Sequence, residues 1–139
     1  MTTKNKIAGY AATGFILLSA ISFLSVSVMA FSNPQAVMDL VNVKLNNNDA
    51  FSSIRGVYGG VGLTLFITLL YMAFKAPKKG VQFLALLWGM YGVSRIVTIF
   101  TEGTLGDFGN QWLVTESAFC GIAILLLLIG PKSTATQIA

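Results

Sequence analysis

The chain has 139 residues, of which 55% are hydrophobic and 10% are charged, with a net charge of +4 and a mean hydropathy of +0.75. A soluble domain carries about 25% charged residues, so this composition excludes an ordinary cytosolic globule or a disordered tail and indicates a membrane protein. There is no histidine, and Cys120 is the only cysteine. These counts exclude Cys/His zinc sites, histidine-ligated haem, Ser-His-Asp and Cys-His catalysis, and an intramolecular disulfide. We therefore expect no metal and no cofactor.

Four apolar segments are long enough to cross a bilayer, whose hydrocarbon core of about 30 Å needs roughly 20 helical residues. They cover about residues 7–31, 51–74, 81–100 and 112–130. A soluble helical bundle is the alternative, but its helices would carry polar faces, whereas the second and fourth segments contain stretches that are apolar on every side. The sequence therefore predicts an all-α, integral membrane four-helix bundle that forms a single domain over residues 1–139.

The first apolar segment follows two lysines, as does the core of a secretory signal peptide. Its apolar run is far longer than the roughly 7–15 residues of such a core. We expect the segment to be a helix of the mature protein.

Basic and acidic residues are separated along the chain. The N-terminal tail, the turn between the second and third spans and the C-terminal tail contain lysines and no acid. The positive-inside rule then predicts that both termini and this turn are cytoplasmic. The basic turn is suited to anionic lipid headgroups, whereas lysines spread over three short segments form no nucleic-acid surface. The lysines of these three segments are Lys4, Lys6, Lys75, Lys78, Lys79 and Lys132. The acids Asp39, Asp49, Glu102, Asp107 and Glu116 lie on the opposite side, where Lys44 is the only lysine.

The loop between the first two spans contains a helix-start pattern. Ser32-Asn33-Pro34-Gln35 has proline in the first turn and glutamine three residues after serine. A short amphipathic helix is predicted to follow, lying at the outer interface or folded over the bundle, with a buried loop helix as the equal alternative. Asp49 is the expected N-cap of the second span, and Trp112 an interfacial anchor of the fourth. The predicted apolar face of the short helix consists of Val37, Leu40, Val41 and Leu45.

Small residues indicate where the spans approach one another. Gly56 and Gly60 form a G-x-x-x-G pair, which allows close contact between helix backbones. We expect these faces to pack inside the bundle rather than in a dimer, and Cys120 to be a small buried residue. The candidate packing glycines are Gly56, Gly59, Gly60, Gly89 and Gly92.

Three ionisable residues lie inside three different spans and at similar depth. Arg55, Arg95 and Glu116 are each about four or five residues from the outer end of their span, which places them roughly 6–8 Å below the boundary. Each costs several kcal/mol in a membrane unless it is paired. Tyr58 and Tyr91 lie on the same helical faces as the two arginines. These five residues are the candidate polar cluster.

The polar cluster has several interpretations. It is a buried salt bridge that fixes helix register, or a pocket for an anionic headgroup or small acid, because two arginines and one glutamate leave one positive charge in surplus. A proton-coupled role for Glu116 is a third interpretation, although neighbouring arginines would keep the carboxylate ionised. No nucleophile–base pair or phosphate loop is evident, so we expect no catalytic residues.

The sequence resembles a family of small four-span bacterial membrane proteins of unknown function, the DUF4345-like proteins. The features that carry the resemblance are Asn33-Pro34, the motif Arg55-Gly56-Val57-Tyr58-Gly59-Gly60, Gly92 with Arg95, and Glu116. The resemblance implies an integral protein of a bacterial inner membrane and brings no activity. A looser similarity in span count to DoxX-like proteins would imply a partner of redox or thiol systems.

Together these features favour a non-enzymatic protein that binds a lipid headgroup or small molecule. The alternatives are a purely structural or accessory subunit, with a homo-oligomer or another membrane protein as its partner, and a small oligomeric transporter. No nucleic-acid partner is expected.

Overall fold

The computed structural model describes the backbone of residues 3–130 and the side chains of residues 6–130. This part of the chain is helical, without strands. Lys132, one of the predicted topology signals, lies outside the described residues. The elements are α1 (Thr3–Ser32), α2 (Pro34–Asp39), α3 (Asn48–Ile54), the π-helix η1 (Arg55–Gly60), α4 (Val61–Lys75), α5 (Pro77–Thr101) and α6 (Asp107–Ile129).

Four helical segments are long and apolar enough to cross a membrane, as the sequence predicts. The second of them runs without interruption through α3, η1 and α4. The helices extend beyond the apolar runs at both loops that precede α5 and α6. Pro77 occupies the first turn of α5, where its missing N–H costs no hydrogen bond, so Lys78 and Lys79 are already helical. Asp107 begins α6, where its negative charge interacts favourably with the positive end of the helix dipole.

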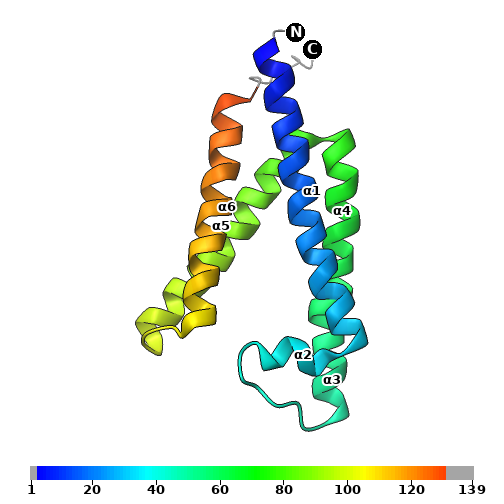
Figure 1. Cartoon of the computed structure of the whole chain (residues 1–139), viewed down its shortest axis with the longest axis vertical. Helices are drawn as coiled ribbons and strands as arrows, with labels where there is room; N and C mark the ends of the chain where they lie inside the picture. The colour runs from blue at the N-terminus through cyan, green and yellow to red at the C-terminus, as the bar shows by residue number, and fades with distance from the viewer. Residues whose placement is uncertain (1–2, 131–139) are drawn as a thin grey trace, which may run out of the picture.

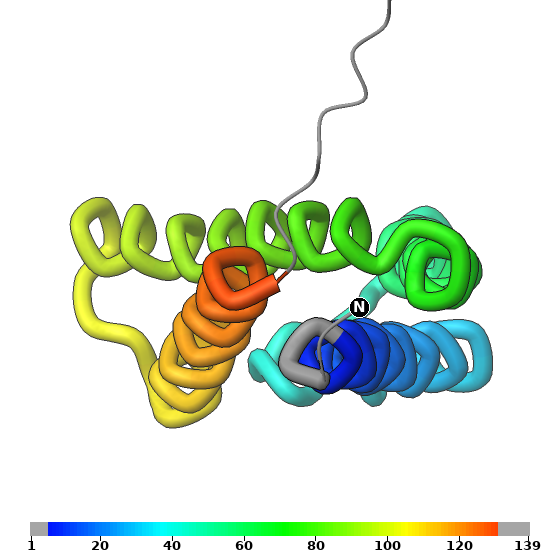
Figure 2. The backbone as a smooth tube through the Cα atoms, turned by 90° about the horizontal axis from the view of Figure 1, so that it is seen from above, coloured from blue at the N-terminus to red at the C-terminus, as the bar shows by residue number. Residues whose placement is uncertain are grey.

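The spans form two pairs that meet at one end of the molecule and diverge at the other. In Figure 1, α1 packs along α4 and α5 pairs with α6. The pairs converge near the N-terminus and separate toward the opposite end, where α2 lies between them (Figure 1). Figure 2, along the long axis, shows α5 leading away from α4 toward α6. The backbones of the two pairs are therefore closer at the N-terminal end than at the α2 end.

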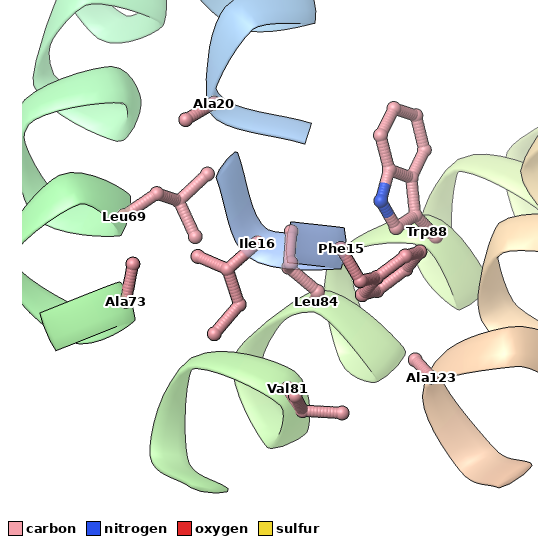
Figure 3. Packing of buried hydrophobic residues seen from close by; sticks show 9 residues of the cluster. All are labelled: Phe15, Ile16, Ala20, Leu69, Ala73, Val81, Leu84, Trp88 and Ala123. Atoms are coloured by element: carbon pink, nitrogen blue, oxygen red, sulfur yellow. The ribbon is translucent and has the colours of Figure 1, made fainter. Parts of the chain in front are cut away.

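The main hydrophobic core joins the two pairs. Ile16 of α1 is fully buried among Leu69 of α4 and Leu84 of α5, and Phe15 faces Trp88 and α6 (Figure 3). A Cβ on Gly80 would lie 2.7 Å from Ile16 Cδ1 and 3.1 Å from Met72 Cβ, so the absence of a side chain at Gly80 allows α5 to approach α1 and α4 closely. The core therefore holds both pairs through α1.

A close approach of backbones joins α1 to the second span. A Cβ on Gly62 would lie 3.2 Å from Ser27 Cβ, and one on Gly59 would lie 3.1 Å from the Phe31 ring. Ser27 Oγ donates a buried hydrogen bond of 2.7 Å to the Gly59 carbonyl oxygen. These contacts fix the α1–α4 pair at the end where the two pairs diverge.

The G-x-x-x-G pair itself makes no such contact. Within the described residues, a Cβ on Gly56 or Gly60 would meet nothing within 4 Å, so the expected internal packing of these two glycines is absent there. Between α5 and α6, a Cβ on Gly89 would lie 3.4 Å from Cys120 Sγ and one on Gly92 would lie 3.8 Å from Ser117 Oγ, both ordinary van der Waals distances.

The first loop differs from its predicted capping pattern. Ser32 is the last residue of α1, where its hydroxyl donates to the Val28 and Met29 carbonyls instead of capping α2. The short helix does begin at Pro34, but it ends at Asp39.

The expected N-cap of the second span was also wrong. Asn47 caps α3 by accepting 2.8 Å from the Ala50 amide, which leaves Asp49 in the first turn. An asparagine two residues earlier in the Asn-rich turn reaches this amide, so the helix starts sooner.

Candidate functional site

A bidentate ion pair joins α5 to α6. Arg95 Nε donates to Glu116 Oε2 at 2.7 Å, and Arg95 Nη2 donates to Glu116 Oε1 at 2.8 Å. The Glu116 side chain is 3% exposed and the Arg95 side chain 23% exposed. Both carboxylate oxygens therefore have a charged donor, which is the geometry that makes arginine–carboxylate pairs strong. The structure brings together these two of the three ionisable residues predicted to cluster.

Arg55 has a different partner. Its Nε donates to the Phe31 carbonyl oxygen at 3.3 Å, at the end of α1, and the residue is exposed. The hydrogen bond satisfies a carbonyl in the last turn of α1, where helix carbonyls lack intrahelical partners. Arg55 thus attaches η1 to the α1 terminus and does not join the Arg95–Glu116 pair.

A cavity of about 290 Å³ lies beside the ion pair, between the two helix pairs. Arg95 and Glu116 are its only charged lining residues within the described chain. Tyr58 and Tyr91 also line it, so four of the five residues predicted as a polar cluster share this cavity. The rest of the wall is mainly apolar and includes Phe23, Val26, Val57, Val61, Leu65 and Phe108.

Aromatic rings form the wall on the α5 side. The Trp88 ring stacks on Phe23 of α1 with centroids 5.4 Å apart, and lies 6.0 Å from Tyr91. Trp88 Nε1 donates to Ser19 Oγ at 3.3 Å, which fixes the orientation of the indole. Both tryptophans of the chain, Trp88 and Trp112, line the cavity. Rigid aromatic walls give the cavity a defined shape.

The π-helix η1 provides the Tyr58 side of the cavity. A π-helical turn contains one residue more than an α-helical turn. It therefore rotates the side chains of α3 about the helix axis relative to those of α4. Sequence reasoning missed η1, although three glycines among its six residues, Gly56, Gly59 and Gly60, are a signal of weakened α-helical geometry. Such π-turns are frequent at functional sites.

The segment after α1 covers one side of the cavity. Val37, Met38, Leu40 and Val41 of this segment line the wall, and Val37 and Met38 also pack on Ala30. The predicted apolar face does not include Met38, whose side chain reaches the cavity only because the loop folds back. We call residues 34–45 the cover segment.

Gln35 holds the cover segment in shape. Its Nε2 donates to Asp39 Oδ1 at 2.7 Å and to the Val43 carbonyl at 2.9 Å, and its Oε1 accepts from the Leu45 amide at 2.9 Å. The hydrogen bonds from Gln35 and Lys44 hold the pKa of Asp39 below its ordinary value of 3.8. The network therefore favours the charged form of Asp39 and stabilises the loop that covers the cavity.

The one cysteine of the chain, Cys120, does not line the cavity. Cys120 is half-buried, and its thiol donates to the Ala85 carbonyl at 3.5 Å. No group of three His, Cys, Asp or Glu side chains in the described part of the chain is placed to hold a metal ion. The site thus consists of an apolar cavity with one ion pair and two phenols.

Comparisons with known proteins identify a family and no activity. The model of the domain of unknown function DUF4345 matches residues 11–127, in agreement with the resemblance noted in the sequence. The match gives no support to the looser similarity to DoxX-like proteins. Neither the curated proteins nor the solved structures contain a match to the chain.

Proposed function

Because the chain belongs to the DUF4345 family, whose function is unknown, we propose a role for it from the cavity. In this role the protein is a non-enzymatic membrane module that binds an amphipathic lipid. The observation that carries this proposal is the position of the Arg95–Glu116 pair in the wall of an otherwise apolar cavity. Ligand sites are typically concave and mainly apolar, with a few polar groups that orient the ligand. A molecule with an apolar tail and a small polar head matches both parts of this wall.

The exposure of the wall supports access from the membrane. Val57 and Val61 line the cavity and are also exposed at the surface of η1 and α4. A ligand can therefore enter sideways between the helix pairs. The cover segment closes another part of the wall with Val37 and Met38.

Orientation follows from the basic residues. The Lys75, Lys78 and Lys79 turn lies at the same end as the N-terminus (Figure 1), and the cavity lies toward the other end, near α2. With this basic end in the cytoplasm of a bacterial inner membrane, the cavity takes lipid from the outer leaflet. The N-in/C-in arrangement is part of the proposal.

An accessory or structural role is the second candidate. The open faces of Gly56 and Gly60 favour it, because small residues on a membrane helix allow another helix to approach closely. In that role the ion pair serves to fix the register of α5 against α6, and a partner polypeptide covers η1.

Intrinsic fluorescence distinguishes the two candidates. Trp88 is 4% exposed, so lipid around the protein has little access to it, whereas an acyl chain in the cavity lies against it. The protein is placed in phosphatidylcholine nanodiscs with a low fraction of one dioleoyl lipid brominated across its double bonds. The lipids are diacylglycerol, phosphatidate and phosphatidylglycerol, tested one at a time. Bound brominated lipid quenches Trp88, whereas surrounding lipid also reaches the half-buried Trp112 in every variant, so the difference from the blocked pair described below reports the cavity.

Blocking variants provide the control. Val26→Phe with Val61→Phe fills the cavity from α1 and α4, whereas Val28→Phe with Ile67→Phe introduces the same side chain at exposed positions of the same helices outside it. We expect at least one lipid to quench the wild type and the control pair at a lower fraction than it quenches the blocked pair. Equal quenching of all three proteins by every lipid would refute lipid binding and favour the accessory role.

A further inference from the structure

The charges at the cavity compensate each other. Arg95 and Glu116 are the charged residues of its wall, and they are bonded to each other at 2.7 and 2.8 Å. Arg55, whose charge would create a positive surplus, donates to the Phe31 carbonyl and does not line the cavity. An anionic head that approached Arg95 would also approach the Glu116 carboxylate, and the repulsion between like charges is poorly screened away from water. The site therefore lacks the net charge that an anion requires.

The wall nevertheless keeps unused hydrogen-bond donors. A guanidinium has five N–H groups, and the bidentate pair uses one on Nε and one on Nη2, so three remain on Arg95. The hydroxyls of Tyr58 and Tyr91 have no hydrogen-bond partner among the described residues. Tyr58 is 40% exposed and Tyr91 is 41% exposed, so their hydroxyls are accessible to a ligand, and within a bilayer no water replaces a missing hydrogen bond. A ligand that brings uncharged oxygen acceptors satisfies these donors.

Resting on the lipid-binding function above, we propose that the cavity selects a neutral lipid whose head presents ester, hydroxyl or ketone oxygens. Tyr58 and Tyr91 are the specificity-determining residues, and they donate to those oxygens together with Arg95. Glu116 has two roles in this selection: it orients the guanidinium and it excludes anionic heads. Diacylglycerol is a lipid of this chemistry, and phosphatidate differs from it by the charged phosphate alone.

The brominated lipids test this selection directly. We expect diacylglycerol to quench the tryptophans at a lower mole fraction than phosphatidate or phosphatidylglycerol does. Tyr58→Phe with Tyr91→Phe removes two hydroxyls and no ring, and should weaken diacylglycerol binding about tenfold to thirtyfold, the effect of two hydrogen bonds. The matched control is Tyr10→Phe with Tyr71→Phe, which removes two exposed hydroxyls outside the cavity and should leave binding unchanged.

Failure of the selectivity and failure of lipid binding give different results. Selective binding of phosphatidate, or unchanged diacylglycerol binding in the Tyr58/Tyr91 variant, would overturn the neutral-head proposal and leave the lipid-binding function standing. If no lipid distinguished the wild type from the blocked pair, the lipid-binding function would fail and the neutral-head proposal with it.

Discussion

Replacing Arg95 with Ala should destabilise the protein more than replacing Glu116 with Ala, although the two side chains form one ion pair. The reason is their unequal burial: Glu116 is 3% exposed, and the Arg95 side chain is 23% exposed. Loss of Arg95 leaves a buried carboxylate without a charge partner, which costs about 3–5 kcal/mol. Loss of Glu116 leaves a guanidinium on a long, flexible stem that can move toward a polar region, so the cost is about 1.5–3 kcal/mol, that of the lost charged hydrogen bonds.

The single cysteine offers the assay. Cys120 is half-buried on α6 and bonded to the Ala85 carbonyl of α5, so its thiol becomes accessible when these two helices separate. A thiol-reactive dye then reports the melting temperature of each variant in detergent, and reversible unfolding in mixed micelles gives the free energy.

The double variant Arg95→Met with Glu116→Met completes the test. Removing both charges leaves none stranded, so the double variant should be close to the wild type or more stable by about 1–4 kcal/mol. A smaller loss of stability for Arg95→Ala than for Glu116→Ala would show that the buried carboxylate does not dominate, and would refute the reasoning. If both single variants had the melting temperature of the wild type, the Arg95–Glu116 ion pair would not form.

Three further measurements probe other parts of the fold. Arg55→Ala should lower the unfolding free energy by about 1 kcal/mol or less, because it removes one exposed hydrogen bond to a carbonyl; a loss as large as that of Arg95→Ala would place Arg55 in a charged network. Gly62→Ala should lower the unfolding free energy by about 1–3 kcal/mol in the same assay, because the new Cβ would lie 3.2 Å from Ser27 Cβ of α1. Gly60→Ala should leave the unfolding free energy unchanged or raise it slightly, because a Cβ there meets no other atom within 4 Å. Equal losses for the two variants would contradict this packing. The side-chain amide resonances of Gln35 should titrate with a midpoint below pH 3.8, because the hydrogen bonds lower the pKa of Asp39 in the folded state. The network persists above pH 3.8 and is lost as the pH falls through the folded-state pKa. Asp39→Asn should abolish this transition, and a midpoint above pH 3.8 would contradict the network.

The four span-like helices could be predicted because apolar length depends only on position along the chain. The sequence also places Arg95 and Glu116 inside two of these helices, and the structure pairs them across α5 and α6. The cost of a lone charge in a membrane makes such a pairing the expected outcome.

The direction of each side chain around its helix could not be predicted in the same way. Arg55 lies at a similar predicted depth but reaches the Phe31 carbonyl, because its direction depends on η1 and on how the second span meets α1. The same limitation applies to the glycines: Gly59 and Gly62 contact α1, whereas Gly56 and Gly60 face away. A spacing of four residues shows that two glycines lie on the same face of a helix, but it does not show which other helix packs against that face.

The energetics of the cavity connect the fold to the proposed function. A cavity of about 290 Å³ enclosed in a packed protein would cost of the order of 7 kcal/mol at roughly 24 cal/mol per Å³, which is comparable to the whole stability of a domain. The Ser27–Gly59 hydrogen bond joins α1 to η1 and the ion pair joins α5 to α6, so each helix pair is fixed internally on its own side of the cavity. In a bilayer an acyl chain that enters the opening removes this cost, because it restores the missing contacts without exposing apolar surface to water. The same feature that would destabilise a soluble protein is therefore stable in a membrane when lipid occupies it.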